Sequence, residues 1–125
     1  MIATTLQVAA GGAIGAAARY LVNTMATRTF GPGFPAGTLI VNVLGSFLMG
    51  ALVVYLARRQ SLALAPILMT GVLGGFTTFS AFSLDVATLY ERGEFGLAAV
   101  YAVASLVLSV GALFAALWLM RGWLA

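Results

Sequence analysis

Four long apolar stretches make up most of this chain and limit the environments in which it can fold. They lie at about residues 4–26, 36–57, 62–90 and 95–120. A bilayer core about 30 Å thick is crossed by about 20 helical residues at about 1.5 Å each, so every stretch is long enough to span it. The connections between them, TRTFGPGFP, RRQSLALAP and ERGE, are short. The sequence therefore predicts an all-α membrane protein with a single four-helix transmembrane domain over residues 1–125.

The composition supports this class and excludes several others. The chain is 62% hydrophobic and 7% charged, whereas soluble proteins average about 45–50% and about 25%. Cysteine and histidine are absent, so thiolate nucleophiles and imidazole metal ligands are unavailable, and we expect no enzyme. The arginines are scattered rather than clustered, so we expect no nucleic-acid partner. No basic segment precedes the first stretch, which we interpret as a membrane span rather than a cleaved signal peptide.

The arginines favour neither orientation in the membrane. With four spans, one side carries Arg58, Arg59 and Arg121, and the other carries Arg28 and Arg92, joined by Arg19 if its side chain reaches that side. Cytoplasmic loops normally hold an excess of Arg and Lys, and that excess sets the orientation. The near balance predicts that copies insert both ways up, as a dual-topology protein.

The size of the chain and its small residues indicate that copies associate. Four packed helices fill their own centre with side chains, so one copy is too small to enclose a polar pathway. Pairs of small residues four apart, which let helices approach closely in lipid, occur in every span. They are Gly11 with Gly15, Ser46 with Gly50, Gly71 with Gly75, and Gly111 with Ala115. These pairs serve either packing within one subunit or contact between subunits.

The first span carries polar residues on one face. Gly12, Gly15, Arg19 and Asn23 follow each other at spacings of three, four and four, which is the helical period. Polar residues inside a membrane are costly and are therefore functional candidates. Arg19 lies about two turns from the end of the stretch, so two interpretations remain. Its side chain either reaches the headgroups or raises the electrostatic potential for anions in an aqueous vestibule.

Polar residues also align on the second and fourth spans. Thr38 and Asn42 are four apart, and Tyr101, Ser105 and Ser109 step by four along one face. Asn42 is either part of a polar pathway or a hydrogen-bonded clip between helices, worth about 0.6 kcal/mol on average in one membrane protein. Each hydroxyl either bonds back to a carbonyl of its own helix or faces the pathway.

The third stretch contains the segment GGFTTFSAFS at residues 74–83 and is longer than a straight crossing requires. Its two adjacent glycines predict a helix broken at mid-membrane. Backbone freed by such a break survives only inside protein or along a cavity. Freed carbonyls suit a cation, and freed amides with the nearby hydroxyls suit an anion. Phe76, Phe79 and Phe82 either pack in a core or present electropositive ring edges to a small anion.

Three motifs in this order resemble the Fluc (CrcB) fluoride channels. They are GGAIGAAARY at 11–20, GTLIVNVLGSF at 37–47 and GGFTTFSAFS at 74–83, and the likeness covers essentially the whole chain. The resemblance implies a fluoride-selective channel that exports fluoride passively across the cell inner membrane. It also implies an antiparallel homodimer with two pores at its interface and a structural sodium ion at its centre. The expected partners are therefore fluoride, sodium, the lipid bilayer and a second copy.

The resemblance also gives roles to single residues. Those expected along the fluoride path are Thr38, Asn42, Phe79, Ser80, Phe82, Tyr101, Ser105 and Ser109. Gly74 and Thr77 match residues whose backbone carbonyls hold sodium, and Arg19 matches a first-helix arginine, consistent with a vestibule position. Ala81 departs from the pattern, because some relatives have a hydroxyl there. The expected row of polar groups beside Ser80 therefore has one hydroxyl fewer in this chain.

Two other functions are compatible with a small four-span chain. A small four-span proton-coupled multidrug exporter has a similar size and topology, but it needs a membrane carboxylate, and only Asp85 is available. A non-transporting assembly protein predicts no ion flux at all. Neutral donors suit fluoride better, because a channel must replace the water of the ion without holding the ion too tightly. No phosphate-binding loop is present, which favours a passive pore.

Overall fold

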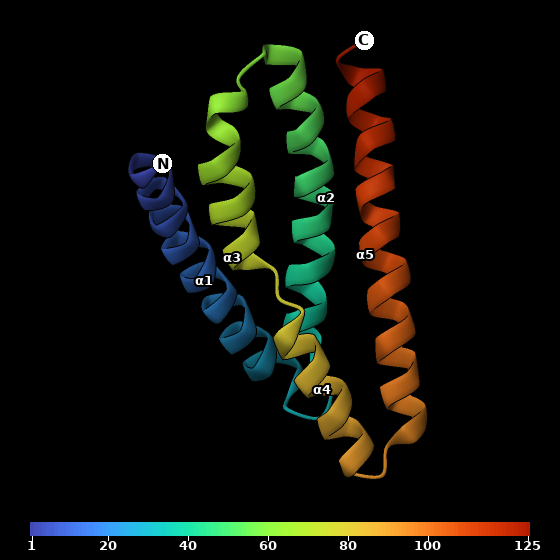
Figure 1. Cartoon of the computed structure of the whole chain (residues 1–125). Coiled ribbons are helices and arrows are strands. Elements are labelled where there is room, and N and C mark those ends of the chain that lie inside the picture. The colour runs from blue at the N-terminus through green and yellow to red at the C-terminus, as the bar shows by residue number, and fades with distance from the viewer.

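The structure, a computed structural model, describes all 125 residues and consists of helices without β-strands (Figure 1). The long helices are α1 (Ile2–Phe30), α2 (Ala36–Arg59) and α5 (Phe95–Trp123). The third apolar stretch is divided into a 3₁₀ turn η1 (Leu62–Leu64), a π-helix η2 (Pro66–Leu73), a single turn α3 (Gly74–Phe76) and α4 (Ser80–Glu91). The all-α class and the four helical segments predicted from the sequence are confirmed.

Two glycines end helices where the sequence has short connections. Gly31 follows α1 with φ at 79°, and its N–H donates to the carbonyl of Thr27. Gly93, with φ at 80°, lies in the turn between α4 and α5. Glycine adopts this left-handed region at little steric cost, which is why it is common just beyond a helix.

Three of the four segments are long and apolar enough to cross a membrane. They are Ala36–Arg59, Leu62–Glu91 and Phe95–Trp123, with mean hydropathies of 2.2, 1.7 and 2.3. The helix α1 has 29 residues, but it is not among them, because polar residues such as Gln7, Arg19 and Asn23 reduce its hydropathy. That α1 crosses the membrane stays a prediction.

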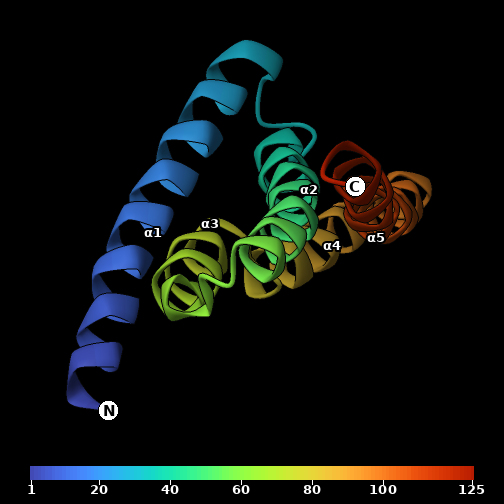
Figure 2. The same ribbon diagram turned by 90° about the horizontal axis from the view of Figure 1, so that it is seen from above.

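The helices form an open row rather than a closed bundle. Viewed from above, α1 and α5 lie at opposite ends, with α2 and the third segment between them (Figure 2). The helix α1 packs against η2, α3 and α2, whereas α5 packs against α2 and α4, and α1 does not contact α5. The sequence predicted four helices packed around their own centre. In the structure the four helices do not surround a common centre. Only 18 of 125 residues are buried.

Glycines set the close contact between α1 and the third segment. A Cβ added at Gly11 would lie 3.0 Å from the Cα of Gly71, and one added at Gly75 would lie 2.7 Å from the carbonyl oxygen of Gly12. Two of the small-residue pairs found in the sequence thus face each other within one chain. Gly111, by contrast, has nothing within 4 Å of an added Cβ, so its pair is left for lipid or for a partner.

Candidate ion pathway

The third segment is interrupted at residues 77–79, between α3 and α4. The break predicted in this segment is confirmed, but Gly74 and Gly75, where the sequence placed it, are both helical. The backbone first becomes extended at Thr77, with φ at −90° and ψ at 160°. The glycines serve helix packing instead, since Gly75 lies directly against α1.

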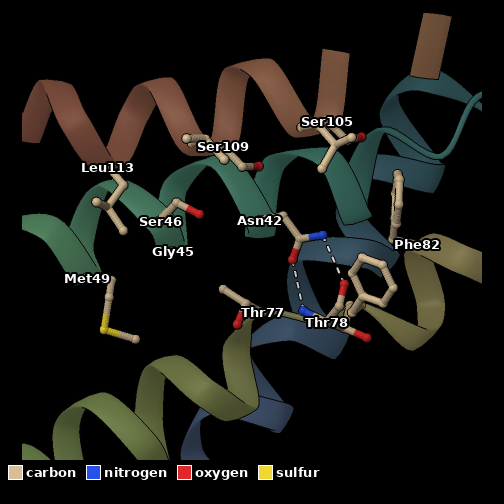
Figure 3. Close-up of a pocket in the computed structure, with 13 residues that line it drawn as sticks. Asn42, Gly45, Ser46, Met49, Thr77, Thr78, Phe82, Ser105, Ser109 and Leu113 are labelled. Carbon is tan, nitrogen blue, oxygen red and sulfur yellow. Dashed lines mark hydrogen bonds between the residues drawn. The ribbon is translucent and has the colours of Figure 1, made fainter. Parts of the chain in front are cut away.

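Asn42 of α2 holds the break in place. Its Nδ2 donates to the carbonyl of Thr78 at 2.9 Å, and its Oδ1 accepts from the N–H of Thr78 at 2.8 Å (Figure 3). The interpretation of Asn42 as a hydrogen-bonded clip between helices is therefore confirmed. A primary amide has two N–H donors, so one remains for another acceptor in the adjoining groove, and the clip does not exclude a place in the pathway.

Thr78 also starts the helix that follows the break. Its Oγ1 accepts from the N–H of Ala81 at 3.1 Å, a contact of the kind by which threonine satisfies the free amides of a helix N-terminus. The sequence reasoning did not single out this role. The available signal was a threonine two residues before the start of the new helix at Ser80.

Several backbone groups at the break have no partner in the chain. They are the carbonyls of Gly74, Phe76 and Thr77 and the amides of Phe79, Ser80 and Phe82. Carbonyl oxygens are the ligands that hard cations prefer, and no cluster of acidic side chains competes with them. The Gly74 and Thr77 carbonyls, which the resemblance connects with sodium, are thus free to bind a cation.

Arg19 is partly buried and contacts the third segment. Its Nε donates to the carbonyl of Gly75 at 3.0 Å, in a partly buried position. A positive charge at the C-terminal end of a helix interacts favourably with the helix dipole. Arg19 thus stabilises the end of α3 just before the break. A position in a vestibule stays a prediction.

A groove of about 270 Å³ opens between α2, α5 and the break. Five of the residues predicted along the fluoride path line it, namely Asn42, Phe79, Phe82, Ser105 and Ser109. The other lining residues are Gly45, Ser46, Met49, Thr77, Thr78, Leu106, Val110 and Leu113. No charged side chain is among them. The groove therefore offers amide and hydroxyl donors in an apolar and uncharged setting (Figure 3).

Two serines of α5 have buried hydroxyls without partners. The Oγ atoms of Ser105 and Ser109 make no hydrogen bond in the chain. Thr77, Ser83 and Thr88 instead donate to the carbonyl four residues earlier, at 2.9, 3.0 and 2.8 Å. The alternative that the two α5 serines bond back to their own helix is therefore wrong. A buried unpaired hydroxyl is costly, so these two indicate a ligand or water in the groove.

Thr38 and Tyr101 are buried next to the groove without lining it. The Tyr101 hydroxyl donates to Oδ2 of Asp85 at 2.9 Å. Asp85, the one carboxylate suitable for proton coupling, is thus engaged in a polar contact. Ser80 does not line the groove either, and its Oγ lies 3.3 Å from that of Thr78 in an exposed position.

The aromatic rings form a continuous series beside the break. Phe79 and Phe82 have centroids 5.5 Å apart, and Phe82 and Tyr101 are 5.4 Å apart. Phe34, which the sequence reasoning missed, meets Tyr101 edge-on at 5.5 Å and 88°. Phe79 remains 72% exposed. A ring so exposed at the groove is not core packing within this chain, and its electropositive edge is available to an anion.

The chain is similar to a described protein family and to several named proteins. The family model described as "CrcB-like protein, Camphor Resistance (CrcB)" matches residues 6–117. The fluoride-specific ion channel FluC of Cereibacter sphaeroides is 62% identical over 125 residues, which are 100% of both chains. The protein of the same name from Agrobacterium fabrum is 58% identical over 116 residues, which are 91% of this chain and 93% of the relative. That of Ruegeria sp. is 55% identical over 123 residues, which are 98% of each.

Proposed function

The chain belongs to the CrcB-like family and is a fluoride channel rather than an enzyme, and on this premise we propose that it conducts fluoride passively as an antiparallel homodimer. One observation carries the proposed path. The hydroxyls of Ser105 and Ser109 are buried without partners in a groove that no charged side chain lines. Such a groove replaces part of the water shell of a small anion without trapping the ion on a full charge.

The open shape of the chain supports the dimer. The groove is not enclosed by one copy, and Phe79 at its edge is 72% exposed. A second copy with the same surface closes such a groove across a two-fold axis, because residues that face the axis meet their own counterparts. Two copies then give two pores. The near balance of arginines on the two sides of the membrane favours the antiparallel arrangement.

We further propose a structural sodium ion at the centre of the dimer. The carbonyls of Gly74 and Thr77 have no hydrogen-bond partner, and two copies bring two such pairs together. Sodium bound there supplies a fixed positive charge and ties the two breaks to each other. Within the chain, Arg19 and Asn42 hold Gly75 and Thr78, the residues that follow these two carbonyls, so the site needs little rearrangement.

The proposed location is the cell inner membrane, where an inside-negative potential drives anions outward. The potential supplies about 2.3 kcal/mol per unit charge for each 100 mV. Fluoride that enters as hydrofluoric acid and dissociates inside is then exported without an energy-coupling device. Asp85 is not required for this transport, because the ion moves down its own electrochemical gradient.

The test is ion efflux from liposomes that contain the purified protein. We expect fast fluoride efflux, chloride efflux at the level of protein-free liposomes, and slower fluoride efflux when sodium is replaced by a large organic cation. A reporter on the C-terminus, active on one side of the membrane only, is expected to detect copies in both orientations. Chloride efflux as fast as fluoride efflux would refute the selectivity, and a one-sided reporter signal would refute the antiparallel dimer.

A further inference from the structure

Two rows of polar side chains lie on α2 and α5, the two helices that border the groove. The α2 row is Thr38, Asn42 and Ser46, and the α5 row is Tyr101, Ser105 and Ser109. Both rows step by four residues, so each stays on one face of its helix. The helices α2 and α5 lie side by side and run in the same direction (Figure 1). The two rows therefore run parallel to each other with the same spacing.

One close contact between the helices indicates how the two rows are aligned. A Cβ added at Gly50 would lie 2.6 Å from the carbonyl oxygen of Leu113. The positions one and two turns before these two residues pair at the same offset, which sets Ser46 opposite Ser109 and Asn42 opposite Ser105. All four of these residues line the same groove (Figure 3).

The hydroxyl of Ser46 is free. It makes no hydrogen bond in the chain, whereas Thr77, Ser83 and Thr88 donate to carbonyls of the preceding turn. Bonding back to a carbonyl of the preceding turn is one common way for serine and threonine to satisfy a hydroxyl within a helix. One step further along both rows, Gly50 and Leu113 offer no side-chain donor. The pair of Ser46 and Ser109 is therefore the last polar level of the groove on that side.

We propose that Ser46 is a fluoride-coordinating residue, which with Ser109 forms the terminal anion site of the path. This inference rests on the proposed function. The two hydroxyls, one from each helix, donate to the ion as it passes between the groove and the apolar level of Gly50 and Leu113. The site takes a small, strongly hydrated anion, because two neutral donors compensate only a compact ion that both can contact.

The test compares fluoride efflux for the wild type, Ser46→Ala and Ser46→Thr, with Thr88→Val as the matched control. The Thr88 hydroxyl donates to its own helix at Leu84, so its removal leaves the path unchanged. Hydrogen bonds to charged groups contribute enough that we expect Ser46→Ala to conduct about tenfold more slowly. Ser46→Thr keeps the hydroxyl and is expected to stay within about twofold of the wild type, as is Thr88→Val.

Several outcomes would overturn the proposal. Ser46→Ala at the wild-type rate would refute it, and so would Ser46→Thr as slow as Ser46→Ala, because volume rather than the hydroxyl would then matter. If Ser46→Ala does not yield a dimer, Ser46→Cys replaces it, since a thiol is a weak donor of similar size, and a wild-type rate again refutes the idea. The combination with Ser109→Ala is expected to be non-additive if both serve one site. Absence of fluoride efflux in the wild type would instead refute the proposed function.

Discussion

Replacing Asn42 with alanine tests how the break is held. The change removes both hydrogen bonds to Thr78, at 2.9 and 2.8 Å, and leaves a partly buried N–H and C=O without partners. Each unsatisfied group costs about 1–3 kcal/mol. The two together are expected to destabilise the fold by about 2–6 kcal/mol and to disorder residues 77–79, so fluoride efflux is expected to fall as well.

Asn42→Asp separates the two hydrogen bonds. The aspartate still accepts from the N–H of Thr78, but it cannot donate to the carbonyl and it sets a negative charge beside an anion path. We expect a smaller loss of stability than in Asn42→Ala, with an equal or larger loss of efflux. Stability is measured by denaturant titration in mixed micelles, and efflux is measured in liposomes. Asn42→Ala unfolding within about 0.5 kcal/mol of the wild type would refute the idea that this amide holds the break.

Three further predictions follow from the same geometry. Phe79→Ile and Phe82→Ile are expected to slow fluoride efflux while the dimer stays intact on size-exclusion chromatography, and unchanged efflux in both would remove the argument from ring edges. Arg19→Ala leaves the Gly75 carbonyl uncapped and is expected to reduce stability by about 1–3 kcal/mol in the same titration, with Arg19→Lys intermediate; stability equal to the wild type would contradict the cap. Gly75→Ala is expected to lower the yield of folded protein, because its Cβ would lie 2.7 Å from the Gly12 oxygen, and equal stability in the titration would contradict this contact.

Much of the fold could be predicted from the sequence, because hydrophobicity and length determine membrane helices almost directly. The exact site of the break could not. Two adjacent glycines indicate flexible backbone as well as close helix packing, and only the tertiary contact between Gly75 and α1 distinguishes the two. The residue at which the backbone becomes extended is Thr77. A threonine in an apolar segment does not by itself mark a helix break.

The candidate site was predicted in part for a similar reason. The periodicity of Ser105 and Ser109 placed both on one face, and that face does line the groove. Ser46 fitted the same spacing on its own helix, yet its pairing with Gly50 also favoured an interpretation as a packing residue. Whether a serine faces a groove depends on the neighbouring helix, and a single sequence does not contain that alignment.

The groups left unsatisfied in one chain connect assembly with conduction. Ser46, Ser105 and Ser109 and the free backbone at the break all lie in or beside one groove, and each would cost several kcal/mol if it faced hydrocarbon. Lipid therefore cannot cover the groove. A partner whose side chains hydrogen-bonded every one of these groups would remove the cost but would also block the path. Water and a small anion also satisfy these groups, and both can leave the groove again. This requires a second copy that excludes lipid without filling the groove. The same unpaired donors that require a partner thus supply the sites through which the ion passes.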